Sequence, residues 1–151
     1  MKAITRIEQS LAMALAAAED ASCPPKLASA VRHAVFPGGA RIRPQLCLAV
    51  AQACGQDDPA LSDAAAVAIE LLHCASLVHD DLPCFDDAPT RRGRASVHWA
   101  FGQPLAVLAG DALIVLAFQT LAAAAGKSPE RLPGLLKIIA GGVGMPGGIV
   151  A

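Results

Sequence analysis

Apolar residues that favour helices dominate this chain, and they do not follow the pattern of a strand. Hydrophobic residues make up 54% of the 151 residues, and alanine, leucine and valine are the commonest of them. No segment alternates β-branched apolar and polar residues at a period of two, so helix is expected nearly throughout. The sequence therefore predicts an all-α helical bundle.

Prolines and glycines divide this apolar sequence into segments, because neither residue fits the interior of a helix. Residues 86–102 are polar and are expected to form a loop with a short helix. Further breaks are expected at residues 56–59, 126–129 and 133–134. The expected helices span residues 3–20, 26–36, 43–55, 62–82 and 104–125.

Charge, cysteine content and hydropathy exclude several classes of protein. The net charge of −1 argues against a nucleic-acid partner, because a phosphate-binding surface normally has a basic excess. Five cysteines without a C-x-x-C pair favour a reduced cytoplasmic protein with unpaired thiols. The longest apolar run, residues 104–118, contains Gly110 and Asp111 and is shorter than the roughly 20 residues that cross a bilayer. We therefore expect a cytoplasmic protein with no transmembrane segment.

Four aspartates lie at the end of the apolar helix expected over residues 62–82: Asp80, Asp81, Asp86 and Asp87. Like charges this close are unfavourable unless a cation relieves their repulsion. Carboxylate oxygens suit Mg²⁺, which fills its other positions with water and substrate phosphate. Asp80 and Asp86 would diverge by about 120° on an ideal helix, but Pro83 interrupts the helix and would let both reach one ion. A solvated acidic loop is the alternative interpretation.

Two clusters of arginine flank this acidic segment. One is Arg91-Arg92-Gly93-Arg94, and the other is the glycine turn Gly38 to Pro44, which has arginines at positions 41 and 43. Guanidinium groups bind phosphate oxygens in a bidentate way, and backbone N–H groups at the start of a helix add to anion binding. Taken alone, such arginines are more often solvated or paired with nearby aspartates. Beside a magnesium site, they indicate two phosphorylated substrates.

Five short segments follow one another along nearly the whole chain: Gly38-Gly39-x-Arg41-x-Arg43-Pro44, Glu70-x-x-His73, Asp80-Asp81-x-x-x-x-Asp86, Arg91-Arg92-Gly93 and Gly110-Asp111-Ala112-Leu113. In this order they resemble the polyprenyl synthase (trans-isoprenyl diphosphate synthase) family. The resemblance is greatest to bacterial geranylgeranyl diphosphate synthases of carotenoid and bacteriochlorophyll pathways. It implies an isoprenoid synthase bundle, with residues 1–151 as the N-terminal part of a single domain.

The resemblance implies a Mg²⁺-dependent prenyltransferase that condenses an allylic diphosphate with isopentenyl diphosphate. Asp80 and Asp86 would ligate Mg²⁺, with Asp81 and Asp87 in supporting roles. Arg91 would hold the allylic diphosphate. The catalytic residues implied by the resemblance are therefore Asp80, Asp81, Asp86 and Arg91. Neutralising the diphosphate would let it leave, and the double bond of isopentenyl diphosphate would attack the resulting allylic cation.

Isopentenyl diphosphate would be bound by Arg43, His73 and Arg92 in this resemblance. The family usually has a lysine where this chain has Ala40. We therefore expect a lower affinity for isopentenyl diphosphate, unless Arg41 compensates. Arg41 could equally serve a structural role.

Chain length in the family depends on residues about one turn before the first aspartate. Here these residues are Ala75 and Ser76, and their small size leaves the floor of the product pocket open. The expected product is therefore geranylgeranyl diphosphate, with twenty carbons. The family also implies a homodimer, for which the apolar segment 104–125 is the candidate interface.

Several features limit or compete with this interpretation. The family's second aspartate-rich motif is absent between residues 95 and 151, and the sequence ends on apolar residues without a polar cap. The chain therefore looks cut after about half of the fold, and alone it is expected to be inactive. The alternatives are a non-catalytic subunit of a heteromeric synthase, a class I terpene cyclase and a purely structural bundle. The intact aspartate and arginine motifs count against a non-catalytic subunit and a purely structural bundle. The two basic clusters favour condensation of two diphosphates over the cyclisation that a terpene cyclase performs.

The remaining histidines and aromatic residues are expected to have ordinary roles. His33, His79 and His98 are interpreted as surface or packing residues. The aromatic side chains of Trp99, Phe101 and Phe118 are expected in the core.

Overall fold

A computed structural model describes residues 3–20, 22–55 and 58–149, and within them the chain is an all-α bundle with one small hairpin. The all-α prediction is confirmed. The elements are α1 (Ala3–Ala18), α2 (Pro25–Val35), α3 (Ile42–Ala53), α4 (Pro59–Asp80), β1 (Thr90–Arg91), β2 (Arg94–Ala95), α5 (Val97–Phe101), α6 (Gln103–Ala124), the short 3-10 helices η1 (Ala125–Lys127) and η2 (Pro129–Arg131), and α7 (Leu132–Val143).

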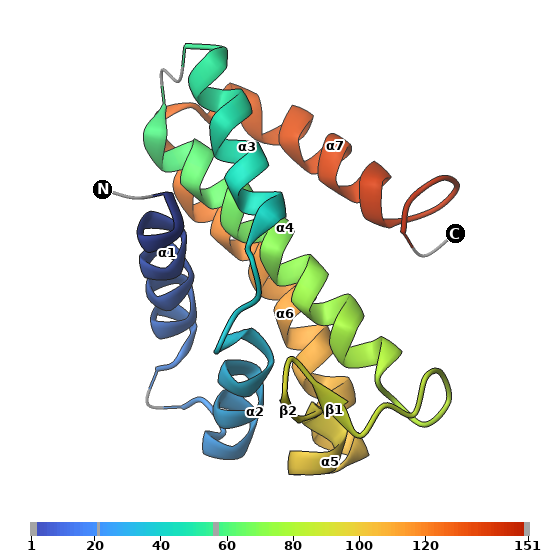
Figure 1. Cartoon of the computed structure of the whole chain (residues 1–151). Coiled ribbons are helices and arrows are strands. Elements are labelled where there is room, and N and C mark those ends of the chain that lie inside the picture. The colour runs from blue at the N-terminus through green and yellow to red at the C-terminus, as the bar shows by residue number, and fades with distance from the viewer. Residues whose placement is uncertain (1–2, 21, 56–57, 150–151) are drawn as a thin grey trace.

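Two long apolar helices, α4 and α6, pack along each other and form the centre of the bundle (Figure 1). Leu71 of α4 and Leu113 of α6 are fully buried between the surrounding helices. The two helices approach closely at Gly110, where an added Cβ would lie 2.1 Å from the Nε2 of His79. A glycine at this position therefore makes room for a packing histidine, and this explains one of the five sequence segments.

The other elements pack around this pair at different heights. In Figure 1, α2, the hairpin and α5 gather at the end of the bundle where α4 finishes. Helix α3 packs on α4, and α7 lies beside α4 and α6 towards their opposite end (Figure 1). The acidic end of α4 is therefore placed next to the arginine-bearing hairpin by the packing of the two central helices.

Helix α4 begins three residues before the expected start because its N-terminus is capped. The Oδ1 of Asp58 accepts a hydrogen bond from the backbone N–H of Leu61 at 3.1 Å, and Pro59 occupies the first turn. Both features favour helix initiation at this point. Asp58 and Pro59 belong to the break expected over residues 56–59, of which residues 56–57 lie outside the described part of the chain.

The segment 86–102 contains a feature that the sequence did not predict. Residues Thr90–Arg91 and Arg94–Ala95 pair as an antiparallel hairpin, with Arg92 and Gly93 at its turn. Both turn residues have positive φ, 53° and 79°. This two-residue turn matches the right-handed twist of a hairpin. An arginine at the first turn position hides the usual Asn-Gly signal, so only a loop and a short helix were expected.

Two other expectations were wrong. The break at residues 133–134 is not a break, because Pro133 lies in the first turn of α7, where a missing N–H costs nothing. Trp99 is 65% exposed instead of buried. Phe101 and Phe118, by contrast, pack against the core as expected.

Two helices, α4 and α6, are long and apolar enough to cross a membrane by length and composition alone. The argument that the apolar run is too short was therefore wrong, since α6 extends over 22 residues. Such a test is also passed by the core helices of bundles, and these two pack mainly on each other. The absence of a transmembrane segment stays a prediction.

Replacing Leu113 by alanine should lower the free energy of unfolding by about 2–5 kcal/mol, because it leaves a cavity between the central helices. The measurement is urea denaturation followed by circular dichroism. Met13→Ala is the control, because Met13 is 66% exposed and its loss should change stability by less than about 0.5 kcal/mol. Equal effects of the two variants would contradict the central position of the α4–α6 pair.

Candidate functional site

The acidic segment folds back on the end of α4. The backbone N–H of Asp86 donates to the carbonyl of Asp80 at 2.9 Å, and that of Ala88 donates to the carbonyl of Asp81 at 3.1 Å. The bonds bring the backbones of Asp80 and Asp86 together although the residues are six positions apart. Both aspartates are exposed to solvent. Their role as metal ligands stays a prediction. That prediction required the helix to be interrupted between the two aspartates, and α4 does end at Asp80.

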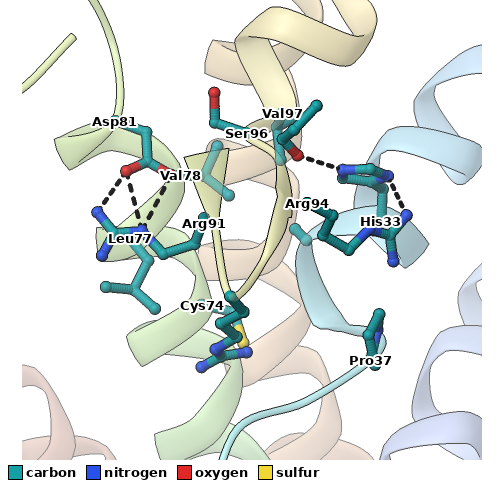
Figure 2. Close-up of a pocket in the computed structure, with 13 residues that line it drawn as sticks. His33, Pro37, Cys74, Leu77, Val78, Asp81, Arg91, Arg94, Ser96 and Val97 are labelled. Carbon is teal, nitrogen blue, oxygen red and sulfur yellow. Dashed lines mark hydrogen bonds and ion pairs between the residues drawn. The ribbon is translucent and has the colours of Figure 1, made fainter. Parts of the chain in front are cut away.

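Asp81, in contrast, is buried and serves as an anchor. Its carboxylate is 2% exposed and accepts hydrogen bonds from the Nε and Nη2 of Arg91; Nε lies 2.9 Å from Oδ1 and 3.2 Å from Oδ2 (Figure 2). The hydrogen bond with Asp81 raises the pKa of Arg91, and the charges of Asp86 and Asp80 act in the same direction. The pair therefore fixes the hairpin strand β1 to the acidic end of α4.

A second group of basic side chains lies along α4, away from the aspartates. His73 and Arg92 each have a buried nitrogen, Nδ1 and Nη1 respectively, without a hydrogen-bond partner among the described residues. Burial lowers the pKa of His73, and the charges of Arg43 and Arg92 lower it further. The Nη1 of Arg92 is a donor, and a buried donor without a partner is costly, so this group suits an anionic ligand that would accept a hydrogen bond from it.

The glycine turn comes close to this basic group. An added Cβ on Gly39 would lie 3.3 Å from the Nε of Arg92, so the turn and the hairpin face each other across a short distance. Arg43, in the first turn of α3, is exposed. The structure thus brings together three residues from three separate segments, and these are the three that the resemblance assigns to isopentenyl diphosphate: Arg43, His73 and Arg92.

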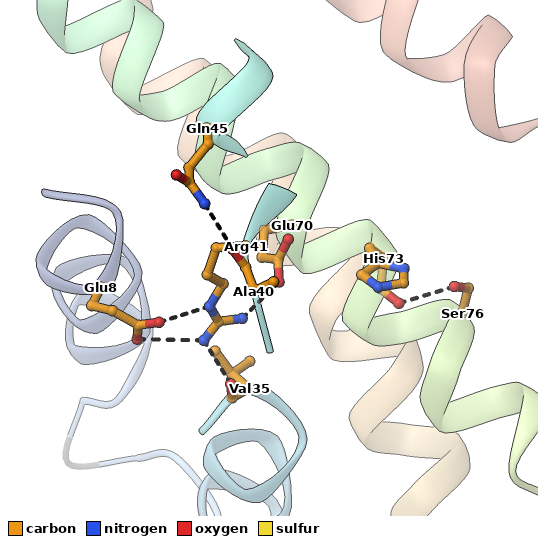
Figure 3. A network of polar contacts seen from close by, with 8 residues as sticks. All are labelled: Glu8, Val35, Ala40, Arg41, Gln45, Glu70, His73 and Ser76. Carbon is orange, nitrogen blue, oxygen red and sulfur yellow. Dashed lines mark hydrogen bonds and ion pairs between the residues drawn. The ribbon is translucent and has the colours of Figure 1, made fainter. Parts of the chain in front are cut away.

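Arg41 lies in the same turn but points into the protein. It is 2% exposed and donates to Glu8 Oε1 at 2.8 Å, to Glu70 Oε1 at 2.7 Å and to the carbonyl of Val35 at 2.8 Å (Figure 3). Burial lowers its pKa, but the hydrogen bonds with Glu8 and Glu70 more than offset this, so the pKa is raised. Arg41 is therefore a structural residue, and the idea that it compensates for Ala40 is wrong.

The two residues expected to line the product pocket have different surroundings. Ala75 is 1% exposed and lies within the core. Ser76 is half-buried, and its hydroxyl donates to the carbonyl of His73 at 2.9 Å (Figure 3). Neither lines the two cavities nearest the basic residues. Their role in chain length stays a prediction.

An apolar cavity of about 290 Å³ opens beside Arg43 and His73. It lies between α4 and α7. Its apolar lining consists of Ile69, Leu72, Ile138, Ile139, Gly142, Val143 and Ile149.

The carboxylates of the acidic segment fit a hard divalent cation only as part of its ligand set. Within residues 3–20, 22–55 and 58–149, no group of three or more His, Cys, Asp or Glu side chains could hold a metal ion. Mg²⁺ commonly takes one or two protein carboxylates and completes its octahedron with water and substrate oxygens. Asp80 and Asp86 fit that mode of binding.

Sequence reasoning treated two further residues of the site as ordinary. Glu8 of α1 completes the network of Arg41, and His33 of α2 bonds to the hairpin. Their partners are 33 and 62 residues away in sequence, so no local pattern marks them. A hint was Glu70, a carboxylate within the apolar stretch of α4.

Comparison with known proteins defines the class first. The chain has the all-α fold of isoprenoid synthases: it matches an isoprenoid synthase family member from Thermotoga neapolitana with a TM-score of 0.77 and 37% identity, covering 89% of this chain and 50% of that one. It matches a geranyltransferase from Legionella pneumophila with a TM-score of 0.87 and 33% identity, covering 95% of this chain and 50% of that one.

The family follows from the sequence match. A family model described as polyprenyl synthetase matches residues 24–141, and the chain belongs to this family. The chain is 60% identical to a geranylgeranyl diphosphate synthase of Cereibacter sphaeroides over 97% of its own length and 51% of the relative's. It thus spans about half the length of the relatives it matches, and it corresponds to their N-terminal half as the resemblance implied.

Replacing Arg41 by methionine should lower the free energy of unfolding by about 3–5 kcal/mol, because Glu70 would remain buried without its partner. The double variant Arg41→Met with Glu70→Leu should recover much of this loss, since an apolar pair needs no charge compensation. Chemical denaturation measures both.

Arg43→Met is the matched control, because Arg43 is exposed two positions further along. Its effect on stability should be below about 0.5 kcal/mol. A single variant of Arg41 that is as stable as this control would contradict the structural role of Arg41.

Proposed function

We propose that this chain forms the substrate-binding half of a Mg²⁺-dependent prenyltransferase. The enzyme condenses an allylic diphosphate with isopentenyl diphosphate, and its main product is geranylgeranyl diphosphate. The observation that carries the proposal is the separation of two polar groups in the site. Carboxylates lie at the end of α4, and the unpartnered basic nitrogens belong to His73, earlier on α4, and to Arg92 at the hairpin turn. Membership of the family supports it.

The residues of the chain divide the binding of the two substrates. Asp80 and Asp86 hold Mg²⁺, which supplies positive charge to the allylic diphosphate as it leaves. Arg91, oriented by Asp81, faces the same diphosphate. Arg43, His73 and Arg92 hold isopentenyl diphosphate, and anion binding there gives the otherwise unpaired Nη1 of Arg92 a hydrogen-bond acceptor.

His73 contributes a proton-linked interaction. Its pKa is lowered by burial and by the neighbouring arginines, so the ring is more readily neutral in the free protein. A bound diphosphate adds negative charge next to it and raises that pKa again. Binding is therefore accompanied by proton uptake at His73.

Two rival functions are weaker. A class I terpene cyclase takes one diphosphate and has no need of a second basic group around His73. A non-catalytic subunit has no need of paired exposed carboxylates at positions 80 and 86. The site chemistry therefore favours condensation of two diphosphates, which a two-substrate assay distinguishes from cyclisation.

The finer assignments rest on the family and the relatives. We propose a cytoplasmic role in isoprenoid biosynthesis that leads to carotenoids, because the matched relatives make geranylgeranyl diphosphate. We also propose a homodimer through α6, where Val107, Leu108 and Val115 are exposed apolar residues. Residues 1–151 are then the N-terminal part of one domain.

The function is tested with the protein encoded by the whole reading frame that contains this chain. With Mg²⁺, isopentenyl diphosphate and an allylic diphosphate, it should form longer prenyl diphosphates, and chelation should abolish turnover. Asp80→Asn should lower kcat by about 10²–10³-fold, the usual effect of losing one electrostatic stabiliser. Thin-layer or mass-spectrometric product analysis measures this.

Asp63→Asn is a matched control, since Asp63 lies on the same helix and pairs with Arg6 at 2.6 Å. Its activity should match that of the wild type. The 151-residue chain alone should be inactive, and turnover by it would show that the second aspartate-rich motif is dispensable. A protein that cyclises the allylic substrate without using isopentenyl diphosphate would refute the condensation.

Replacing Ala75 by tyrosine should shorten the product from twenty to fifteen carbons, because a large ring there would close the path of the growing tail. Ala75 is buried, so overpacking will also cost about 1–3 kcal/mol of stability. Ser76→Phe provides a half-buried second position that tolerates added bulk. Unchanged product length in both folded variants would disprove the assignment of the pocket floor.

A further inference from the structure

The arginine hairpin is tied to the end of α2 by three hydrogen bonds that join its second strand to residues about sixty positions earlier. Arg94 Nη1 donates to the carbonyl of Phe36 at 2.6 Å, and its Nη2 lies 2.5 Å from the Nδ1 of His33. In return, the Nε2 of His33 lies 2.8 Å from the carbonyl of Ala95. Figure 2 shows the two side chains facing each other beside the hairpin. We call this group the His33–Arg94 clasp.

The partners of the clasp fix the protonation of His33. A guanidinium group has only donors, so Nδ1 must accept from Arg94 and cannot carry a proton. A carbonyl only accepts, so Nε2 must carry the proton that it donates to Ala95. The ring is therefore held as the neutral Nε2–H tautomer, and its edge-on contact with Phe101, with ring centroids 5.2 Å apart, limits its rotation.

Several charged groups surround this ring. Arg94 of β2 is its direct partner, while Arg91, Arg92, Asp81 and Cys74 share the small cavity that His33 lines. On α2 itself, the neighbouring Arg32 is paired with Glu19 of the α1–α2 connection. Arg94 is also held at the C-terminal end of α2, where carbonyl groups without helical partners favour a cation.

The clasp joins the two basic segments of the site. Two residues after Phe36, the chain enters the glycine turn that leads to Arg43, and two residues before Arg94 it passes through Arg92. Gly39 of the turn and Arg92 of the hairpin are close to each other, since a Cβ added to Gly39 would lie 3.3 Å from the Nε of Arg92. The relative position of turn and hairpin therefore depends on Arg94 bonding to α2.

We propose that His33 and Arg94 are positioning residues that hold the hairpin arginines opposite the glycine turn, and so set the geometry of the diphosphate site. This deepens the proposed function and rests on it for the nature of the ligand. Neither residue touches substrate in this proposal. Asp81 fixes the hairpin from the α4 side through Arg91, and the clasp fixes it from the α2 side.

The first test concerns the clasp itself and needs no ligand. Long-range ¹H–¹⁵N spectra of the purified chain should show His33 as the Nε2–H tautomer. The backbone N–H of Ser96, which donates to the carbonyl of Pro89 at 3.0 Å at the base of the hairpin, should exchange slowly. In His33→Leu and Arg94→Leu this exchange should accelerate at least about tenfold. Unchanged exchange in both variants would overturn the clasp.

The second test measures the affinity for inorganic pyrophosphate by calorimetry at fixed ionic strength. His33→Leu should weaken binding about tenfold, because loss of hydrogen bonds to a charged partner is typically worth this much. His33→Asn should restore most of the affinity, because its amide oxygen can accept from Arg94 in place of Nδ1. Arg32→Gln is the matched control on the same helix turn and should bind like the wild type.

The outcomes separate the two levels of the proposal. A leucine variant that binds pyrophosphate as the wild type does, or an asparagine variant no better than the leucine variant, would overturn the positioning role. If the wild-type protein encoded by the whole reading frame does not bind pyrophosphate, the diphosphate assignment fails, and the exchange of the Ser96 amide still decides whether the clasp holds the hairpin.

Discussion

The packing of α4 against α6 is the constraint on which the rest of the structure depends. Both helices are apolar over most of their surface, and neither could remain in water without the other. Their contact fixes the end of α4 as one end of the bundle, and α2, the hairpin and α5 gather there. Charged residues that are distant in sequence thereby reach one end of a hydrophobic core that contains few polar groups.

Three buried or half-buried contacts of arginine side chains, two of them ionic, then orient the segments that carry the site. Asp81 bonds to Arg91, Glu8 and Glu70 bond to Arg41, and His33 and Phe36 bond to Arg94. Such contacts add little net stability, because desolvation of the charges offsets their attraction. They instead fix orientation, because each contact holds a loop against a helix in one geometry. Each contact involves an arginine, whose planar group donates two or more hydrogen bonds in fixed directions.

The sequence predicted the helices well because local signals define them: proline and glycine breaks, apolar content and the absence of alternation. The residues assigned to the basic group came only from the order of the family motifs, and their roles stay a prediction. Sequence reasoning failed where the outcome depends on distant partners. The turn at Arg92-Gly93 lacks a standard hairpin signal, and the exposure of Trp99 depends on how α5 sits against α6.

Arginines illustrate this limit most clearly. Arg41 and Arg43 are two positions apart, yet one is fully enclosed by carboxylates while the other is exposed. A positive φ of 50° at Arg41 turns the chain between them and sends the two side chains in different directions. Arg41 is therefore already paired, while Arg43 is exposed at the start of α3. In the proposed function the second diphosphate depends on Arg43, His73 and Arg92, so the spacing between the turn and the hairpin matters for its binding.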